Sequence, residues 1–376
     1  MKFTQSIFAA AFAFAAAAAF AAPVTTQGVG VGKHGDIQVA VTFDNGKIQK
    51  IDILKNAENP VLAKKVFTDL KDQIVAANSV QLDGISGATF TSKGLFAAVE
   101  DAAKKAGVTL GQADKKALKA AVKDLPKDAS YDVVVIGAGG AGFSAAIEAK
   151  NAGATVVLLE KMPQVGGNSL ISGAEMNAAK NWVQPKLGIT DDSPELHAKD
   201  TYLGGDKKGD MKVINVMTHN ALAGAEWCRD YLGVRFEPDN LFFFGGHSRK
   251  RALIPVGHTG TEFITKFQAK ADELGIPVIT NMKAEELIKD KSGRVVGVKA
   301  TMNGAEYTFN AKGGVVLATG GFGANPAMVK KYNPKIDERF KTTDAPGTTG
   351  EALYMAQRAG AELVNMQYIQ TYPICD

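Results

Sequence analysis

The chain has 376 residues, which at about 100–200 residues per domain predicts two or three domains. Its hydrophobic fraction of 45% is ordinary for a globular protein, and its net charge of +4 is too small for a nucleic-acid-binding surface. We therefore expect no nucleic acid among its partners.

The cysteines and histidines exclude several metal centres. The five histidines are scattered without the spacing of metal ligands, and two cysteines, Cys228 and Cys375, cannot hold an iron–sulfur cluster. No Cys-x-x-Cys-His motif is present to attach a c-type haem. We expect no bound metal. An oxidising compartment would permit a disulfide, but nothing in the sequence indicates that these two cysteines pair.

The first 22 residues have the features of an export signal. Lys2 precedes an apolar run, Ile7 to Ala22, that is shorter than the about 20 residues a membrane-spanning helix needs. Ala19-Phe20-Ala21 fits an A-x-A cleavage site. We expect residues 1–22 to be a signal peptide, cut near Ala21 or Ala22, and the mature protein to be periplasmic. The alternative is an uncleaved anchor.

Residues 23–106 have the pattern of a small α+β module. Apolar residues alternate along Ile37 to Phe43 and, less regularly, along Ile48 to Leu54. Asp44-Asn45-Gly46 between them is a tight-turn signal, so the two runs predict a β-hairpin. Apolar residues at helical spacing then predict a helix over Pro60 to Ala77.

A short motif stands before the next predicted helix, which we expect Ser92 to cap. It runs Asp83-Gly-Ile-Ser-Gly-Ala-Thr89, and an ordinary turn before a capped helix is one interpretation of it. The motif also resembles the flavinylation site of FMN-binding modules in bacterial sodium-pumping and electron-bifurcating complexes. That resemblance implies a covalent FMN on Thr89, lined by Ser86, Gly87 and Ala88 and attached by a separate flavin transferase. The helix N-terminus would offer N–H groups to the phosphate.

A second domain is expected from Tyr131, after a Lys- and Ala-rich linker over residues 107–130. The β-branched run Val133 to Ile136 predicts a buried parallel strand, followed by a helix over Ala141 to Ala152 and a strand over Thr155 to Leu159. This order is typical of a βαβ unit with a parallel sheet.

Later strands predict a meander. Val295 to Ala300 and Glu306 to Phe309 flank Asn303-Gly304, a second hairpin signal. A separate short strand, Val315 to Leu317, then leads into a turn that begins at Ala318.

The first strand–helix turn carries a dinucleotide fingerprint. Gly137 makes the tight turn, Gly139 lets the backbone approach a pyrophosphate, and Gly142 packs the helix on the strand. Glu160, at the end of the next strand, can accept ribose hydroxyls and disfavours a 2′-phosphate. NAD and FAD both satisfy this pattern, but a second glycine turn at Gly166-Gly167 favours FAD.

From Tyr131 onward the chain resembles the flavoprotein family of fumarate reductases and succinate dehydrogenases, and within it the soluble flavocytochrome c branch. The resemblance implies an FAD, and it implies the residues that line this cofactor: Gly137, Ala138, Gly139, Ala141, Gly142, Glu160, Lys161, Gly166, Gly167, Asn168, Ser169, Gly173, Ala284, Thr319, Gly320 and Gly321. Membrane-bound relatives attach FAD through a His in the second glycine turn. Here Asn168-Ser169 offers none, so we expect the FAD to be non-covalent.

The predicted fold class is α/β: a Rossmann-type FAD-binding domain with a βββ meander, preceded by a small α+β FMN-binding module. The sequence departs from the family at Ala174-Glu175, where relatives usually have two glycines. His247, Arg249, Arg251 and His258 lie in segments similar to a family loop near flavin and substrate; a surface basic loop is the alternative.

The last residues resemble the family's entry into its capping domain. Fumarate reductases have a His before the Pro that is Pro373 here, whereas urocanate reductases are similar to this chain in having Tyr. The resemblance implies that Tyr372 contacts substrate; packing in a domain joint is the alternative. The family's proton donor lies beyond this point. We therefore expect the domain over 131–376 to end in the start of a truncated capping domain, and we name no catalytic residue.

Together these features predict an enzyme that reduces the C=C bond of a 2-enoate, urocanate-like or fumarate-like. Electrons would pass from FMN to FAD to substrate, supplied by a donor such as a membrane quinol-oxidising cytochrome. Three alternatives stay open: a dehydrogenase working in the oxidative direction, an electron-transfer flavoprotein carrying both flavins without its own turnover, and a flavin-storage protein.

Overall fold

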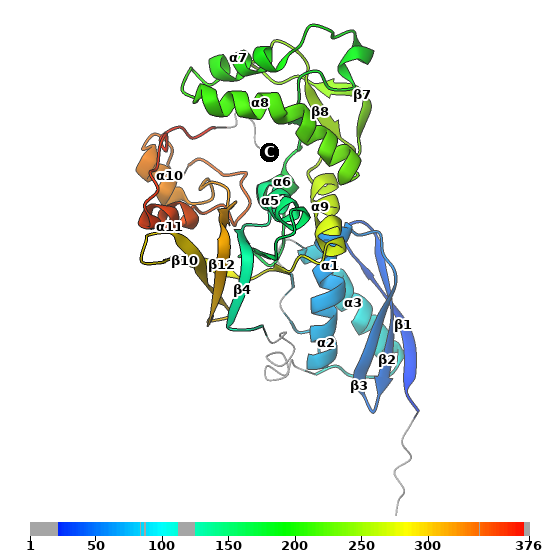
Figure 1. Cartoon of the computed structure of the whole chain (residues 1–376). Helices are drawn as coiled ribbons and strands as arrows, with labels where there is room; N and C mark the ends of the chain where they lie inside the picture. The colour runs from blue at the N-terminus through cyan, green and yellow to red at the C-terminus, as the bar shows by residue number, and fades with distance from the viewer. Residues whose placement is uncertain (1–21, 83, 86–87, 112–124, 338, 372–376) are drawn as a thin grey trace, which may run out of the picture. The chain divides into compact units, whose positions relative to one another are not determined.

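The computed structural model describes residues 22–82, 84–85, 88–111, 125–337 and 339–371 (Figure 1). The signal-peptide residues 1–21, Ser86 and Gly87 of the FMN motif, most of the linker, Tyr372 and Cys375 lie outside these ranges. The chain forms two compact units, residues 1–59 with 66–122, and residues 60–65 with 123–376.

The first unit is a three-stranded antiparallel sheet with helices on it. Its turn residues Asn45 and Gly46 have φ of 48° and 75°, which confirms the predicted hairpin. The helix predicted from Pro60 forms in pieces, with a π-helical segment between two α-helical ones. The elements are β1 (Val24–Val31), β2 (Asp36–Asp44), β3 (Lys47–Lys55), α1 (Pro60–Lys65, grouped with the second unit), η1 (Val66–Leu70), α2 (Lys71–Ala77) and α3 (Thr89–Lys105).

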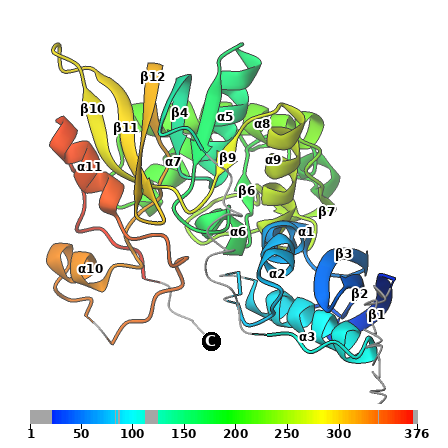
Figure 2. The same cartoon turned by 90° about the horizontal axis from the view of Figure 1, so that it is seen from below.

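The core of this unit lies between the sheet and α3. Alternate residues of β2, from Ile37 to Phe43, point into it and are buried, as the period-two pattern predicts. They meet Leu95 and Val99 of α3. Figure 2 shows α3 lying along the sheet. β1 was not predicted from the sequence, because its polar and glycine residues give no alternating apolar pattern.

The start of α3 differs from the prediction. The helix begins at Thr89, with Ala88 at the N-cap, so the expected cap at Ser92 is wrong. Ser92 lies inside the first turns and its Oγ donates to the Ala88 carbonyl at 2.9 Å. The same Oγ accepts the Ile85 N–H at 3.0 Å. Ser92 thus fixes the preceding loop to the helix instead of capping it.

The second unit is built on a mixed sheet with strand order β10-β11-β12-β4-β5-β9. The strands β12, β4, β5 and β9 are mutually parallel, and β10, β11 and β12 form the predicted antiparallel meander (Figure 2). Their bounds are β4 (Asp128–Ile136), β5 (Val156–Leu159), β9 (Val278–Ile279), β10 (Lys283–Lys289), β11 (Val295–Met302) and β12 (Ala305–Leu317).

Two differences from the prediction concern these strands. β4 begins at Asp128, three residues before the expected domain start at Tyr131. Val315 to Leu317 is not a separate strand but the end of the long β12, whose pairing with β4 is interrupted between Ala311 and Gly314. One strand therefore belongs to both the meander and the parallel sheet.

Helices cover both faces of this sheet. Val135 and Leu158 point to one face, where Phe143 of α5 packs with Phe267 of α9. Their sequence neighbours Val134 and Val157 point to the other face. The helices of this unit are α5 (Gly140–Asn151), α6 (Gly167–Ile171), α7 (Pro194–Gly204), α8 (Met211–Glu226), α9 (Thr261–Glu273), α10 (Pro326–Tyr332) and α11 (Glu351–Ala359), with the short turns η2 (Gln184–Leu187) and η3 (Trp227–Tyr231).

A smaller antiparallel sheet has the strand order β6-β8-β7. Near it, α7 and α8 run side by side (Figure 1). Its strands are β6 (Met176–Asn177), β7 (Phe236–Phe242) and β8 (Ala252–Pro255). Within the ranges given above, no helix combines the length and the apolar character that crossing a membrane requires.

Candidate functional site

The turn between β4 and α5 has the geometry that the fingerprint predicts. Gly137 has φ of 102°, and a Cβ there would lie 2.4 Å from the Ala318 carbonyl oxygen. A Cβ on Gly142 would lie 1.8 Å from the Gly137 carbonyl oxygen. Both glycines are therefore required by packing within the protein. Gly137 allows the turn and the close approach of the Ala318 backbone, and Gly142 allows α5 to pack on the turn.

Gly139 is different, because the protein leaves space beside it. A Cβ on this residue would meet Ser169 Oγ and the Gly166 carbonyl oxygen at 3.6 and 3.7 Å, ordinary van der Waals distances. It is the N-cap of α5, so the first N–H groups of that helix face outward from the same turn. A backbone cradle with N–H donors, open at the second glycine, fits a pyrophosphate.

Glu160 follows β5 and is held in place by backbone donors. Its Oε2 accepts the Ala138 N–H at 2.9 Å and its Oε1 accepts the Met162 N–H at 2.8 Å. Burial raises the pKa of this carboxyl, against the opposing effect of those hydrogen bonds. The side chain thus lies beside the first glycine turn, where an acidic residue of a dinucleotide fingerprint accepts ribose hydroxyls.

The second glycine turn packs directly on the first. The Gly166 N–H donates to the Ala138 carbonyl at 2.7 Å, and Ser169 Oγ accepts the Gly140 N–H at 3.1 Å. Gly166 and Gly167 have φ of 110° and 48°, and α6 begins there. The first glycine turn, Gly137 to Gly142, and the second, Gly166 to Ser169, are separate in the sequence but thus form one continuous surface, which we call the wall.

The segment after β12 closes the same wall. The Ala318 N–H donates to the Ile136 carbonyl at 2.8 Å, which brings Thr319 to Gly321 beside the first glycine turn. Gly320 has φ of 71°. The structure therefore gathers the predicted residues of both glycine turns, Glu160 and the 319–321 segment at the carboxyl ends of β4, β5 and β12, the usual ligand edge of such sheets.

The loop over residues 344–351 is fastened to these turns. Asn168 Nδ2 donates to Asp344 Oδ1, and Asn168 Oδ1 accepts the Ala345 N–H at 2.6 Å. Lys161 forms an ion pair with Glu351 at 2.9 Å and donates to Thr349. Two predicted FAD-lining residues thus also hold the 344–351 loop.

Three other predicted positions are less closely tied to this wall. Ala284 lies in β10, opposite Ala300. Gly173 precedes Ala174, which adopts φ of 57°. Ala141 is the exposed second residue of α5.

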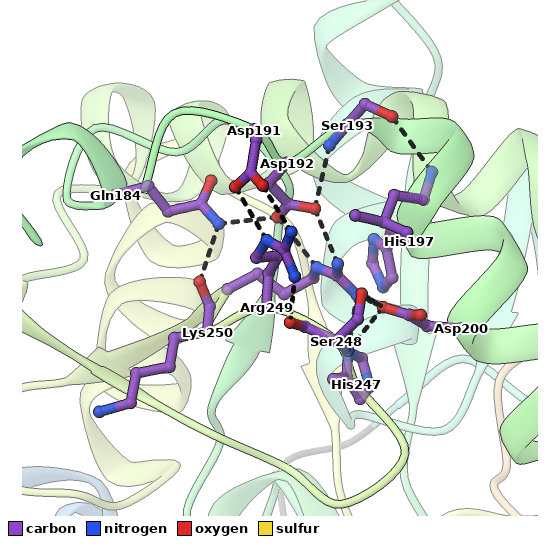
Figure 3. A network of polar contacts seen from close by, with 12 residues as sticks. Gln184, Asp191, Asp192, Ser193, His197, Asp200, His247, Ser248, Arg249 and Lys250 are labelled. Atoms are coloured by element: carbon purple, nitrogen blue, oxygen red, sulfur yellow. Dashed lines mark hydrogen bonds and ion pairs between the residues drawn. The ribbon is translucent and has the colours of Figure 1, made fainter. Parts of the chain in front are cut away.

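A buried ion-pair network joins the start of β8 to α7 and the segment before it (Figure 3). Arg251, 1% exposed, contacts Asp192 through two bonds at 3.0 and 2.7 Å and Asp200 at 2.7 Å. Burial would raise the pKa of Asp192, but hydrogen bonds from Arg251 and Gln184 outweigh it and lower this pKa. The Arg251 carbonyl accepts the Ala178 N–H at 3.0 Å. The network therefore holds β8 against the segment that follows β6.

Of the four basic residues considered from the sequence, Arg251 is buried in this network. Its Nη1 lies 2.9 Å from His247 Nδ1, whereas Arg249 is half-buried and pairs with Asp191. His258 is exposed, with φ of 50°. Nothing in the residues around Arg251 indicated that the carboxylates of residues 192 and 200 would enclose it.

His197 is a buried member of the same cluster. Its ring centroid lies 5.7 Å from that of His247, and its Nδ1 is buried without a hydrogen-bond partner among the described residues. Burial, with the charges of Arg251 and His247, lowers the pKa of His197 to about 4. The imidazole is therefore neutral at physiological pH.

In the first unit, the proposed FMN attachment residue stands at a helix N-terminus. Thr89 is the first residue of α3 and is exposed, while Ala88 before it is 4% exposed. An exposed hydroxyl beside the free N–H groups of a first helical turn fits a phosphoester.

Metal and thiol chemistry have little support in the ranges that the structure covers. There, no group of three or more His, Cys, Asp or Glu side chains is arranged to hold a metal ion. Cys228 is a free, buried thiol whose pKa burial raises to about 11, so it is a poor nucleophile.

Comparisons with known proteins agree with both halves of this description. An FAD-binding-domain family model matches residues 132–375, and an FMN-binding-domain model matches residues 32–104. A solved flavocytochrome c3 fumarate reductase in its open conformation superposes with a TM-score of 0.59 at 32% identity, over 67% of this chain and 44% of that one.

Two curated relatives are similar over much of the chain. A urocanate reductase of Eggerthella lenta is 43% identical over 354 residues, 93% of this chain and 58% of the relative. A cytochrome-type fumarate reductase of Shewanella frigidimarina is 36% identical over 262 residues, 69% of this chain and 45% of the relative. The chain thus spans about half the length of these relatives. It belongs to the FAD-binding flavoprotein family of fumarate and urocanate reductases, with an FMN-binding domain ahead of its FAD-binding domain.

Proposed function

We propose that the chain is the flavin-carrying part of a periplasmic reductase that saturates the C=C bond of a 2-enoate. The observation that carries the proposal is the pairing, in one chain, of an FMN-binding domain with an FAD-binding domain that is similar to urocanate and fumarate reductases. Bound flavins would supply the redox chemistry, which is electron transfer between FMN and FAD and hydride donation to the substrate. The protein's part is to bind and orient them.

The residues of the FAD wall support this division of labour. The cradle at Gly139 and the N-terminus of α5 would hold the pyrophosphate, and Glu160 the ribose. Asn168 and Lys161 hold the 344–351 loop beside the two glycine turns, and these contacts would keep the bound cofactor enclosed.

We propose a substrate that bears an aromatic or heteroaromatic ring, with urocanate favoured over fumarate. Fumarate has a carboxylate at each end, and Tyr372 in place of a His provides no positive charge for the second one. An unpaired buried carboxylate costs several kcal/mol, whereas a ring stacked on Tyr372 gains about 0.5–1.5 kcal/mol beyond its burial.

The test is kcat/KM of the full gene product for fumarate, urocanate and a cinnamate, with a reduced dye as electron donor. A preference for urocanate of about tenfold or more supports the proposal, since tenfold corresponds to about 1.4 kcal/mol. A preference for fumarate would overturn the substrate assignment. Absence of turnover with every enoate would favour the electron-carrier alternative.

We further propose that FMN is esterified to Thr89 and that FAD is bound non-covalently. Intact mass after co-expression with a flavin transferase should show one FMN adduct, and Thr89→Ala should abolish it. Acid precipitation should release the FAD, because Asn168-Ser169 stands where a flavin-linking His would be needed. An adduct that survives Thr89→Ala contradicts the first statement; FAD retained in the precipitate contradicts the second.

The periplasmic location rests on the apolar N-terminal run and its A-x-A site. N-terminal sequencing of the mature protein should find a start near Ala22. In that compartment the reductant would be a redox partner, such as a membrane quinol-oxidising cytochrome. An uncut chain recovered from the cytoplasm would contradict this part of the proposal.

A further inference from the structure

The exposed side of α3 carries the proposed attachment residue and two side chains close to it. From Thr89 to Glu100, the exposed residues of this helix are Thr89, Phe90, Lys93, Ala97 and Glu100. Residues three or four positions apart are neighbours on a helix surface, with Cβ atoms about 5–6 Å apart. Lys93 is therefore a neighbour of both Thr89 and Phe90. Because helical side chains tilt toward the N-terminus, Lys93 leans toward the Thr89 hydroxyl.

The N-terminal end of α3 has positive charge that nothing balances. Its first turn has no acidic residue and no capping side chain, and the N–H groups of a first turn amount to about half a positive charge. Lys93 adds a full charge one turn later. Its helix neighbours Thr89, Phe90, Phe96 and Ala97 include no carboxylate, and within the described residues it forms no ion pair or hydrogen bond. An anion on Thr89 would supply the missing negative charge.

The other two lysines of α3 have surroundings that stabilise a cation. Lys105 pairs with Asp101 at 2.6 Å, and Lys104 stands four residues after Glu100, the spacing of a stabilising pair. Both lie in the last turn, where the helix dipole favours positive charge. Neither advantage applies to Lys93, so the stability of the helix does not account for its charge, whereas a bound anion does.

Phe90 is a large aromatic side chain left in solvent. It is 64% exposed, and it is the one exposed aromatic residue in the described part of the chain before residue 112. The others there are Phe43, which is buried, and Phe67 and Phe96, which are half-buried. An isoalloxazine ring tethered to the preceding residue would cover Phe90, and flat aromatic rings favour stacked or edge contacts.

We propose that the attached FMN lies on this exposed side of α3, where Lys93 pairs with the phosphodiester on Thr89 and Phe90 contacts the isoalloxazine ring. The proposal rests on the proposed attachment of FMN at Thr89. The two side chains have the chemistry of the two ends of the ligand, a cation for the anionic phosphodiester and an aromatic ring for the flat flavin. Both lie outside residues 86–89, which the motif assigns.

The test of Lys93 compares the chain before and after FMN attachment, driven to completion with flavin transferase and FAD and verified by intact mass. Calorimetry should show that attachment raises the melting temperature by about 1–4 °C less in Lys93→Gln than in the wild type, the effect of one i,i+4 ion pair on a small domain. The difference should vanish at about 1 M salt, where charges more than about 3 Å apart are screened.

Two further variants are the controls for this measurement. Lys93→Arg keeps the charge and should behave as the wild type. Lys104→Gln removes the same charge from an exposed position at the other end of the helix, and attachment should stabilise it as much as the wild type. An equal gain in melting temperature in Lys93→Gln and the wild type would overturn the role of Lys93.

The test of Phe90 uses an indole, which quenches flavin fluorescence on contact. Thr89→Ala carries only FAD, so its signal is subtracted to leave that of FMN. FMN fluorescence should fall several-fold in Phe90→Trp and stay at the wild-type value in Lys104→Trp. Undiminished fluorescence in Phe90→Trp would overturn the role of Phe90. If the wild-type chain takes up no FMN, or Thr89→Ala still does, the attachment at Thr89 itself fails, which is a different result.

Discussion

Ala174 is a residue with an unfavourable backbone conformation. Its φ of 57° lies in the left-handed region, where a Cβ costs roughly 1–2 kcal/mol. Ala174→Gly should therefore raise the free energy of unfolding, by about 0.5–1 kcal/mol after the greater flexibility of glycine in the unfolded chain is subtracted.

Urea unfolding of the two proteins measures this change. Ala145→Gly, in the interior of α5, is the control and should destabilise by about 0.5–1 kcal/mol. If both substitutions destabilise equally, Ala174 is not strained in solution.

His197 makes stability depend on pH. Its pKa is about 4 in the folded protein and 6.5 ordinarily, so between these values the unfolded chain binds a proton that the native protein does not. Stability from this group is complete above pH 6.5 and falls as the pH is lowered to 4, by an amount on the order of 2–3 kcal/mol.

The check is the difference in unfolding free energy between pH 7 and pH 4.5, for wild type and for His197→Leu. Arg251 faces the ring and stays charged throughout this range, whereas His247, Asp192 and Asp200 also face it and contribute their own titration to both proteins. The variant should therefore show a smaller loss than the wild type, and equal losses would contradict the assignment.

At the scale of elements, two glycines of the first βα turn have different roles, one in packing and the other in ligand binding. Gly142→Ala places a Cβ 1.8 Å from the Gly137 carbonyl oxygen, so α5 must shift, and we expect a loss of about 1–3 kcal/mol in the FAD-free protein. Gly139→Ala meets nothing closer than 3.6 Å. It should leave that stability within about 0.5 kcal/mol and weaken FAD binding at least about tenfold.

Thermal melts without flavin and titration with FAD give the two readouts. If Gly139→Ala binds FAD with wild-type affinity, the pyrophosphate does not lie over that glycine.

The 344–351 loop should control how quickly FAD leaves. Burial alone would raise the pKa of Glu351, but hydrogen bonds from Thr349 and Lys161 outweigh this effect, and the pKa is lowered to about 2. The ion pair to Lys161 is therefore present across the physiological range. Glu351→Gln should speed FAD dissociation several-fold, as followed by flavin fluorescence. Glu286→Gln removes an ion pair of the same 2.9 Å length, with Lys299, and should have no effect.

Features with a local signal were predictable from the sequence. Asn45-Gly46, Asn303-Gly304, Gly137 and Gly142 have the positive φ or close contacts that their residue types indicate. The α3 start was misplaced because Ser92 has a capping residue's chemistry but uses it inside the helix.

Contacts between distant polar residues had no such signal. Asn168 and Asp344 are 176 residues apart, and Lys161 and Glu351 are 190 apart. Nothing in the composition of either segment indicates its partner. The burial of Arg251 between two carboxylates was missed for the same reason. The strand β1 was missed because glycine contacts with α3, and not an apolar face, hold it in place.

For the whole molecule, two units with separate cores imply two separable flavin sites. Thr89→Ala should lose the acid-stable flavin and keep a full complement of acid-released FAD. Gly139→Ala should show the reverse. Flavin content before and after acid precipitation measures both. Loss of both flavins in either variant would show that the two sites depend on each other.

The strand β12 belongs to both the meander and the parallel sheet, and this has a consequence for biosynthesis. Asn310 on β12 contacts Asp128 on β4 across 182 residues of chain. At about 5–20 residues per second, the ribosome needs roughly ten seconds or more to make the intervening segment. Throughout that time β4 lacks its β12 neighbour and Gly137 lacks the Ala318 carbonyl against which it packs. The FMN-binding unit, whose contacts are all made earlier, can fold while the FAD-binding unit is still being synthesised, so FAD can be captured only late in translation or after it.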